Sequence, residues 1–400
     1  MSPNTTSSLS IIINTITLTH SHDVTKPNSI LQWLYKLFHS HLHQTSHLSS
    51  TMASNSKTLL VSDLVSSEKI DQVPSNYIRP ISERPNLQDV YDDPIPLIDL
   101  NDLCGPNRAH VVDQIGLACR KYGFFQVKNH GVPESIIANM MQIAHEFFKL
   151  PEQERLKTYS DDPKRTTRLS TSFNIRTEKV ANWRDFLRLH CYPVQDYINE
   201  WPTNPAHFRA HVAEYSHSTR DLALRLVDAI SESLGLEKDY INKQLGKHGQ
   251  HMALNYYPPC PQPDLTYGLP GHTDGNLITI LLQDEVPGLQ VMRDGHWVAV
   301  RPVPNTFIIN IGDQMQVISN DKYKSVLHRA VVNCDRERLS IPTFYCPSPD
   351  AVIGPAPKLV TLDEPAVYKE FTYGEYYDKF WNKGLASVSC LDMFMTTSSV

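Results

Sequence analysis

Three residues of types that commonly bind metals stand in order in the second half of the sequence. His272 and Asp274 are two positions apart, so on an extended strand both side chains leave the same face. His328 lies in a later apolar run and can supply a third ligand from another strand. Two imidazoles and one carboxylate on one side of a metal leave the opposite coordination positions open. The spacing therefore predicts the facial metal centre of a non-haem iron(II) oxygenase.

A possible clamp for a carboxylate follows ten residues after His328. Arg338 and Ser340 are again spaced for one face of a strand, and an arginine fork binds a carboxylate while a nearby hydroxyl donates to it. The residues between His328 and Arg338 are turn-like, which predicts that the two lie on adjacent arms of a hairpin. Iron beside an anchored carboxylate indicates a site for 2-oxoglutarate.

Each of these features has an ordinary structural interpretation when taken alone. A His-x-Asp pair is commonly a surface hydrogen-bonding pair, a single histidine in an apolar run is commonly a core residue, and Arg-x-Ser is commonly a solvated strand edge. Their occurrence in this order favours the metal site. A zinc hydrolase would accept the same donors, but zinc hydrolysis needs no second carboxylate clamp, so Arg338 and Ser340 argue against it.

The composition excludes several classes of partner. The chain has 400 residues, 40% of them hydrophobic and 20% charged, with a net charge of -6. This balance predicts a globular protein of one large or two smaller domains that binds neither nucleic acid nor a membrane. We expect a monomer, although composition does not determine the oligomeric state. Seven cysteines without a close pair indicate reduced thiols and a cytoplasmic location, with the nucleus as a second possibility.

The chain divides by composition into five segments. Residues 1–51 are rich in Ser, Thr and His and contain no Arg; we expect a disordered extension or an upstream gene-model segment, and organelle transit stays open. An entry arm, 52–94, precedes a helical N-terminal domain, 95–250. A β domain, 251–350, would hold the site, and a C-terminal helix with a tail would occupy 351–400.

Hydrophobic periodicity predicts helices in the first domain and short strands in the second. Eight short strands in the second domain indicate a closed or two-sheet antiparallel architecture, and the last helix is long enough to lie across its mouth or across the N-terminal helices. The predicted helices are 107–121, 134–149, 204–235, 239–245 and 368–382. The predicted strands are 95–100, 122–127, 168–173, 183–193, 252–257, 277–283, 289–293, 297–300, 306–311, 316–318, 328–332 and 340–345.

The motifs together resemble the plant 2-oxoglutarate- and iron(II)-dependent dioxygenases over about residues 70–385. The resemblance is carried by the segment 255–261 (Asn-Tyr-Tyr-Pro-Pro-Cys-Pro), the His and Asp pair, His328, Arg338 with Ser340, and the segments 96–100 and 123–131. Segments 170–174, 182–193 and 339–349 are most similar to the downy-mildew-resistance subgroup, which contains salicylate 5-hydroxylases and related flavone synthases.

This resemblance implies an α+β fold: a double-stranded β-helix (jelly-roll) core, a helical N-terminal domain and a C-terminal helix. It implies that iron(II) is held by His272, Asp274 and His328. Arg338 and Ser340 would bind the distal carboxylate of 2-oxoglutarate, and Asn255 and Tyr257 would contact its other end. Dioxygen would be the oxidant, 2-oxoglutarate would be converted to succinate, and ascorbate would serve as a reductant in vitro.

The implied substrate is a small aromatic molecule. Salicylate, hydroxylated at C5 to 2,5-dihydroxybenzoate, would place the protein in salicylate catabolism and the negative regulation of plant defence. The alternative is a flavone synthase I acting on a flavanone such as naringenin. Phe344 either stacks on the flat substrate or packs in the core. A catalytically silent small-molecule receptor is the hypothesis from a different class, and the complete set of ligands argues against it.

Overall fold

The computed structural model describes residues 60–67, 70–175, 178–384 and 389–396. The predictions for residues 1–51 and the first residues of the entry arm lie outside this part of the chain. Residues Leu59–Val400 form one compact unit. The boundaries at residues 95, 251 and 351 stay predictions.

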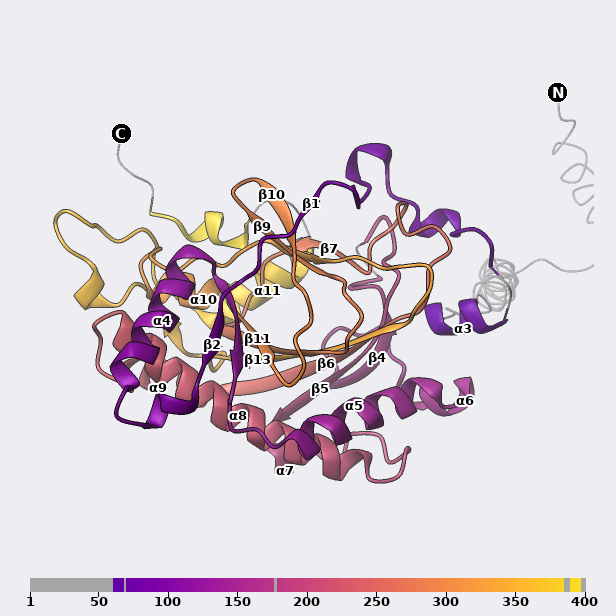
Figure 1. Cartoon of the computed structure of the whole chain (residues 1–400), viewed down its shortest axis with the longest axis horizontal. Helices are drawn as coiled ribbons and strands as arrows, with labels where there is room; N and C mark the ends of the chain where they lie inside the picture. Colours follow the sequence, from indigo (N-terminus) through magenta and orange to yellow (C-terminus); the bar gives the residue numbers. More distant parts are fainter. Residues whose placement is uncertain (1–59, 68–69, 176–177, 385–388, 397–400) are drawn as a thin grey trace, which may run out of the picture. The chain divides into compact units, whose positions relative to one another are not determined.

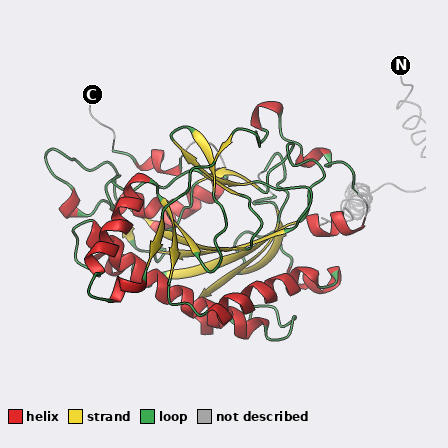
Figure 2. Cartoon of the chain, in the orientation of Figure 1, coloured by secondary structure: helices red, strands yellow, loops and turns green. Residues whose placement is uncertain are grey.

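Two β-sheets form the centre of this unit (Figures 1 and 2). The larger sheet has the strand order β2-β3-β11-β8-β13-β6-β5-β4, and the smaller has the order β1-β10-β9-β12-β7. Most neighbouring strands run antiparallel, so the predicted α+β jelly-roll fold is confirmed. The larger sheet consists of β2 (Leu97–Asp99), β3 (Phe124–Lys128), β4 (Thr167–Thr171), β5 (Asp185–Tyr192), β6 (Gly249–Tyr257), β8 (Ile278–Gln283), β11 (Phe307–Ile311) and β13 (Arg338–Cys346). The smaller consists of β1 (Val90–Tyr91), β7 (Leu269–His272), β9 (Leu289–Arg293), β10 (His296–Ala299) and β12 (His328–Ala330).

Long helices cover the outer face of the larger sheet. Helices α5 (Glu134–Lys149) and α8 (Phe208–Ser233) run beneath β5 and β6 in Figure 1, and α4 (Arg108–Lys121) packs beside α8. The buried residues of α5 recur at helical spacing, from Ile136 and Ile137 through Met140 to Phe147 and Phe148, because one apolar stripe faces the sheet. Helix α5 has the predicted bounds.

The remaining elements are short. The other helices are α3 (Val61–Ser67), α6 (Glu152–Arg155), α7 (Val194–Tyr197), α9 (Tyr240–Gln244), α10 (Asp313–Ile318) and α11 (Tyr373–Lys383). The 3-10 turns are Ser75–Tyr77, Ile81–Glu83, Asn101–Cys104, Leu156–Thr158, Pro357–Leu359 and Cys390–Phe394, and β14 (Val352–Ile353) pairs with β15 (Phe371–Thr372).

Three local predictions were wrong. Residues 316–318 are helical, within α10, because a short apolar run does not distinguish a buried helix from a strand. Helix α8 begins at Phe208 rather than at 204, since the residue before Pro205 is biased away from helical geometry. The last helix begins at Tyr373, where the Thr372 hydroxyl caps it by accepting a hydrogen bond from the Glu375 N–H.

The predicted hairpin between His328 and Arg338 was also wrong. Strand β12 pairs with β7 and β9 in the smaller sheet, whereas β13 pairs with β6 and β8 in the larger one. The turn-like residues between them carry the chain from one sheet to the other, as strands at the corner of a sandwich do. The two side chains therefore come from different sheets.

Gly123, between α4 and β3, has a φ of +63°, and an added Cβ would lie 2.4 Å from Cγ2 of Val326 and 2.6 Å from the Lys324 carbonyl oxygen. We expect Gly123→Ala to lower the free energy of unfolding by about 3 kcal/mol, from left-handed backbone strain plus overpacking. The matched control is Gly295→Ala, where φ is +82° and nothing lies within 4 Å. It should cost only about 1 kcal/mol. Denaturant unfolding measures both, and equal losses would contradict the steric account.

Candidate metal and co-substrate site

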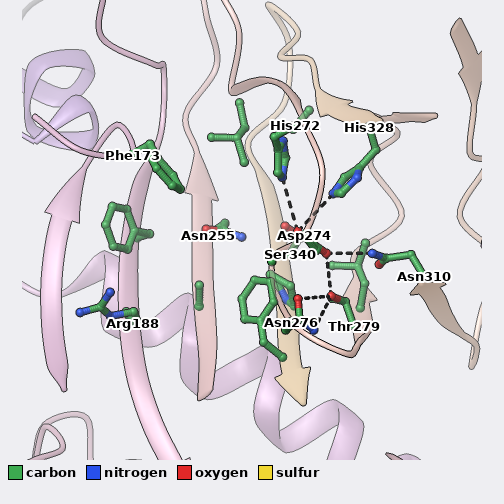
Figure 3. Close-up of a pocket in the computed structure, with 18 of the residues that line it drawn as sticks. Phe173, Arg188, Asn255, His272, Asp274, Asn276, Thr279, Asn310, His328 and Ser340 are labelled. Carbon is green, nitrogen blue, oxygen red and sulfur yellow. Dashed lines mark hydrogen bonds and ion pairs between the residues drawn. The ribbon is translucent and has the colours of Figure 1, made fainter. Parts of the chain in front are cut away.

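The predicted metal ligands converge between the two sheets. One ligand atom from each of His272, Asp274 and His328 lies within 4.8 Å of the others. The Nε2 atoms of His272 and His328 lie 3.8 Å and 3.6 Å from the same Asp274 Oδ1 atom. His272 ends β7 and His328 begins β12, and these strands are paired at that position. Asp274 lies just beyond the end of β7 rather than on it, and all three side chains still face one point (Figure 3).

Backbone carbonyls fix which nitrogen of each imidazole is available. Nδ1 of His272 lies 2.9 Å from the Pro270 carbonyl oxygen, and Nδ1 of His328 lies 3.1 Å from that of Val326. Because a carbonyl only accepts, each Nδ1 carries the hydrogen and donates it. Each Nε2 is therefore the nitrogen left toward the shared point, which is the usual outer-shell arrangement of a metal-binding histidine.

Two polar side chains of the larger sheet hold the carboxylate. The Thr279 hydroxyl donates to Asp274 Oδ2 over 2.6 Å, and the Asn310 amide donates to the same oxygen over 2.8 Å. Both donors are buried. Oδ2 is thereby occupied, and Oδ1 is left facing the two imidazoles (Figure 3).

The electrostatics suit a cation. Burial and the neighbouring His328 lower the pKa of His272 to about 3, so its ring is neutral at neutral pH. Burial alone would raise the pKa of Asp274, but the two imidazoles and the hydrogen bonds to Oδ2 outweigh it and lower that pKa. One carboxylate and two imidazole nitrogens are a donor set that fits non-haem iron(II).

The predicted co-substrate residues lie on the inner face of the larger sheet. Arg338 pairs with Tyr257, and Ser340 pairs with Asn255, across β13 and β6. Side chains of a strand alternate between faces, and all four of these line the same cavity as the metal ligands. The ring centroid of Tyr257 lies 5.2 Å from Arg338 Cζ, so Tyr257 lies at the guanidinium end of the cavity. This position does not fit the expectation that Tyr257 contacts the opposite end of the co-substrate.

Arg338 is a buried cation without an acidic partner. It is 3% exposed, and it donates from Nε to the Val286 carbonyl and from Nη2 to Gln283 Oε1. Within the described part of the chain, no carboxylate forms an ion pair with it. An uncompensated buried charge is costly, and a dicarboxylate in the cavity would supply the missing anion.

Comparisons with known proteins agree with this geometry. The profile of the 2OG-Fe(II) oxygenase superfamily matches residues 248–347, and that of the N-terminal region of non-haem dioxygenases in morphine synthesis matches residues 95–204. A protein named DMR6-like oxygenase 2, from Arabidopsis thaliana, is 64% identical over 85% of this chain and 99% of its own length. This chain belongs to the 2OG-Fe(II) oxygenase family. It is therefore an oxidoreductase that uses iron(II), 2-oxoglutarate and dioxygen.

Two further relatives and one solved structure give the range of this similarity. Downy mildew resistance 6 of Arabidopsis thaliana is 54% identical over 81% of this chain and 95% of its own length. Flavanone 3-dioxygenase 2 of Oryza sativa subsp. japonica is 54% identical over 83% and 97%. The crystal structure of JOX2 in complex with 2OG, Fe and JA has a TM-score of 0.77 and 35% identity, covering 84% of this chain and 98% of that one.

The rest of the oxygenase cavity is largely aromatic. Helix α11 lines this cavity, which fits the first of the two positions expected for it, and contributes Tyr373, Tyr377, Phe380 and Trp381. Phe344 lines the same cavity but also stacks on His251 and packs against the core, so both of its predicted roles stay open. Among the helices that the structure describes, none combines the length and apolar character needed to cross a membrane.

The sequence did not single out Thr279 or Asn310. Both are polar residues inside otherwise apolar strands, between Ile278 and Ile280 and between Ile309 and Ile311. A buried polar side chain needs a hydrogen-bond partner, so their position in such runs was the available signal.

We expect Thr279→Val to weaken iron(II) binding about 10- to 100-fold while the fold is kept, because it removes one of two donors that orient Asp274. Anaerobic metal titration measures the affinity. Thr306→Val is the control, since that hydroxyl donates to the Val303 carbonyl and not to a metal ligand. Unchanged affinity in the Thr279 variant would show that the hydrogen bond does not orient the carboxylate.

Gly288 leaves room for the Arg338 side chain, because a Cβ at position 288 would lie 2.8 Å from Arg338 Cδ and 2.9 Å from Arg338 Nε. We expect Gly288→Ala to displace the guanidinium and to weaken 2-oxoglutarate binding about 10-fold or more, the usual cost of losing a charged hydrogen bond, without changing metal affinity. Calorimetry of the anaerobic metal-loaded protein separates the two effects. Equal 2-oxoglutarate affinity in the variant and the wild type would contradict this role of Arg338.

Proposed function

We propose that His272, Asp274 and His328 hold the iron(II) of this oxygenase. The convergence of Nε2, Oδ1 and Nε2 carries this assignment. Arg338 and Ser340 would bind the distal carboxylate of 2-oxoglutarate. Tyr257, which packs on Arg338, belongs at the same end, and Asn255 lies one step along β6 toward the 2-oxo acid end.

The chain's own residues bind, orient and exclude water. Iron(II) bound here would supply the activation of dioxygen that couples decarboxylation of 2-oxoglutarate to oxidation of the substrate. Arg338 fixes the register of the co-substrate by its charge, and the Thr279–Asp274–Asn310 group keeps one carboxylate oxygen directed at the metal. The aromatic side chains of α11 cover the mouth of the cavity and keep it dry.

We propose salicylate as the substrate. One molecule each of salicylate, dioxygen and 2-oxoglutarate would give one each of 2,5-dihydroxybenzoate, succinate and carbon dioxide. The support is the resemblance to the downy-mildew-resistance subgroup, in which the 64% and 54% identical Arabidopsis relatives are named, together with the aromatic lining of the cavity. This activity would remove salicylate and so act as a negative regulator of defence.

The second candidate is oxidation of a flavanone such as naringenin to a flavone. Its support is the rice relative named flavanone 3-dioxygenase 2, which is as similar to this chain, at 54% identity, as downy mildew resistance 6. A flat flavanone would use the same aromatic walls.

A reducing compartment, the cytoplasm, and a monomeric state complete the proposal. The support for the compartment is that all seven cysteines are free thiols, which is typical of proteins kept in reducing surroundings. Light scattering of the purified protein tests the oligomeric state.

The test offers salicylate and naringenin side by side to the purified protein with iron(II), ascorbate and 2-oxoglutarate. We expect salicylate to stimulate succinate formation and 2,5-dihydroxybenzoate to appear in equal amount by chromatography. His272→Ala is the inactive control, and it should lose metal binding with its unfolding midpoint unchanged. Turnover of naringenin but not of salicylate would replace the first candidate by the second, and stimulation by neither would contradict both.

A further inference from the structure

Three buried arginines lie at the β4–β5 end of the larger sheet. Arg168 is 2% exposed, and Arg184 and Arg188 are each 6% exposed. Across the described residues, no carboxylate lies within ion-pair distance of any of these three guanidinium groups. Burial and the charges of the other two lower the pKa of Arg168 to about 10. This end of the cavity therefore carries buried positive charge without a paired carboxylate, and Asp162, Glu178 and Asp185 offset it only from beyond ion-pair distance.

The three arginines differ in how their donors are used. Arg184 donates to the Ser172 carbonyl from Nε and Nη2 and to Asn255 from Nη1, and Arg168 does not line the cavity. Arg188 lines the cavity, and its Nη2 donates to two carbonyl oxygens, those of Pro163 and Arg165, over 2.5 Å and 2.6 Å. Its Nε is covered by protein atoms and has no hydrogen-bond partner among the described residues, so the donors left for a ligand are those of Nη1, which forms no hydrogen bond with a described residue. Two backbone carbonyls therefore hold the Arg188 guanidinium in place, and it still has donor hydrogens that no described residue accepts.

Arg188 is well separated from the co-substrate clamp. Arg338 pairs with Tyr257, and the register of β5 against β6 aligns Tyr257 with Arg184, four residues before Arg188. Four residues of strand span about 13 Å, and two strand spacings between β13 and β5 add about 10 Å across the sheet. The two guanidinium groups therefore mark two distinct anion positions on one sheet face.

Arg188 also faces the metal ligands across the cavity. Across the sheet, Arg188 on β5 pairs with Ala253 on β6, which lies opposite Pro342 on β13. Two residues further along β13, Phe344 pairs with Thr279, whose hydroxyl donates to Asp274. Figure 3 shows Arg188 on the wall opposite His272, Asp274 and His328, with Phe173 above it. The Cζ atom of Arg188 lies 5.6 Å from the ring centroid of Trp381, and that ring stacks on Phe173 at 4.8 Å. Small residues line the floor of this space, and aromatic ones form its walls.

We propose that Arg188 determines substrate class by binding the carboxylate of an aryl carboxylate whose ring lies between the aromatic walls and the metal. An anion at this position would receive a charge-assisted hydrogen bond and balance the buried arginines. The ring would then extend from the carboxylate toward the metal ligands. This inference rests on the proposed function and deepens it, because it favours salicylate over the flavanones, which carry no carboxylate.

The test compares a charged ligand with its neutral counterpart. Calorimetry measures binding of salicylate, benzoate, salicylamide and naringenin to the anaerobic holoprotein with iron(II) and 2-oxoglutarate. We expect the wild type to bind salicylate about 10- to 100-fold more tightly than salicylamide, the range expected for a charged hydrogen bond. Arg188→Gln should remove that preference, and Arg188→Lys should restore part of it.

Arg209→Gln is the matched control, because that guanidinium also donates only to backbone carbonyls and does not line the cavity. It should keep the preference. A wild type that binds salicylamide as tightly as salicylate would overturn the inference, whatever the folding of the variants, and so would an Arg188→Gln protein that folds and keeps the preference.

The two proposals fail in different ways. If benzoate binds in an Arg188-dependent manner and salicylate is not hydroxylated, the carboxylate site stands and the proposed substrate is wrong. If salicylate is hydroxylated with equal affinity in the wild type and Arg188→Gln, the proposed function stands and the role of Arg188 is wrong.

Discussion

The hydrogen bonds to Asp274 Oδ2 are the constraint on which the rest of the site depends. The residue follows the end of β7, so no strand pairing orients it. Its position comes from Thr279 on β8 and Asn310 on β11, which hold one carboxylate oxygen and leave the other toward the two imidazoles. These contacts join the smaller sheet, which carries both histidines, to the larger sheet, which carries the co-substrate residues. The distance between the two sheets therefore helps to set the position of Asp274 relative to the two histidines.

Charge organises the cavity along the face of the larger sheet. Arg338 at one end and Arg188 toward the other are both buried, and neither forms an ion pair within the described chain, although Asp284 and Asp162 act on them from farther away. Between them lie a carboxylate and two imidazoles directed at one point. On the proposed assignment, the charges of the co-substrate and the substrate would place each molecule at its own arginine, and the metal would lie where the two molecules meet. Buried arginine charge reduces the stability of the fold, and in this arrangement bound anions offset that cost.

Much of the fold could be predicted from the sequence because its strongest patterns are local. The apolar stripe of α5 gave its exact bounds, and most strands lie within two or three residues of their predicted positions. Hydrophobic periodicity did not reveal strand β7, because Pro270 and Gly271 within it are poor strand formers, and only the spacing of His272 and Asp274 indicated a strand there. The route from His328 to Arg338 was mistaken for a hairpin because turn residues do not reveal whether the chain re-enters the same sheet. The spacing of His272 and Asp274 pointed to the right ligands although only the first lies on a strand.

The supporting residues of the site could be found only after the strands were aligned. Gly288 matters because it adjoins Arg338, and Arg188 because it lies four residues along β5 from the position that aligns with the co-substrate clamp; neither relation exists within one segment. The most direct measurement is a crystal structure of the protein grown anaerobically with iron(II) and 2-oxoglutarate, with an anomalous map at the iron edge. We predict one iron peak bound by Nε2 of His272 and His328 and Oδ1 of Asp274, with the distal carboxylate on Arg338. An iron peak elsewhere, or a distal carboxylate bound at Arg188, would contradict the account.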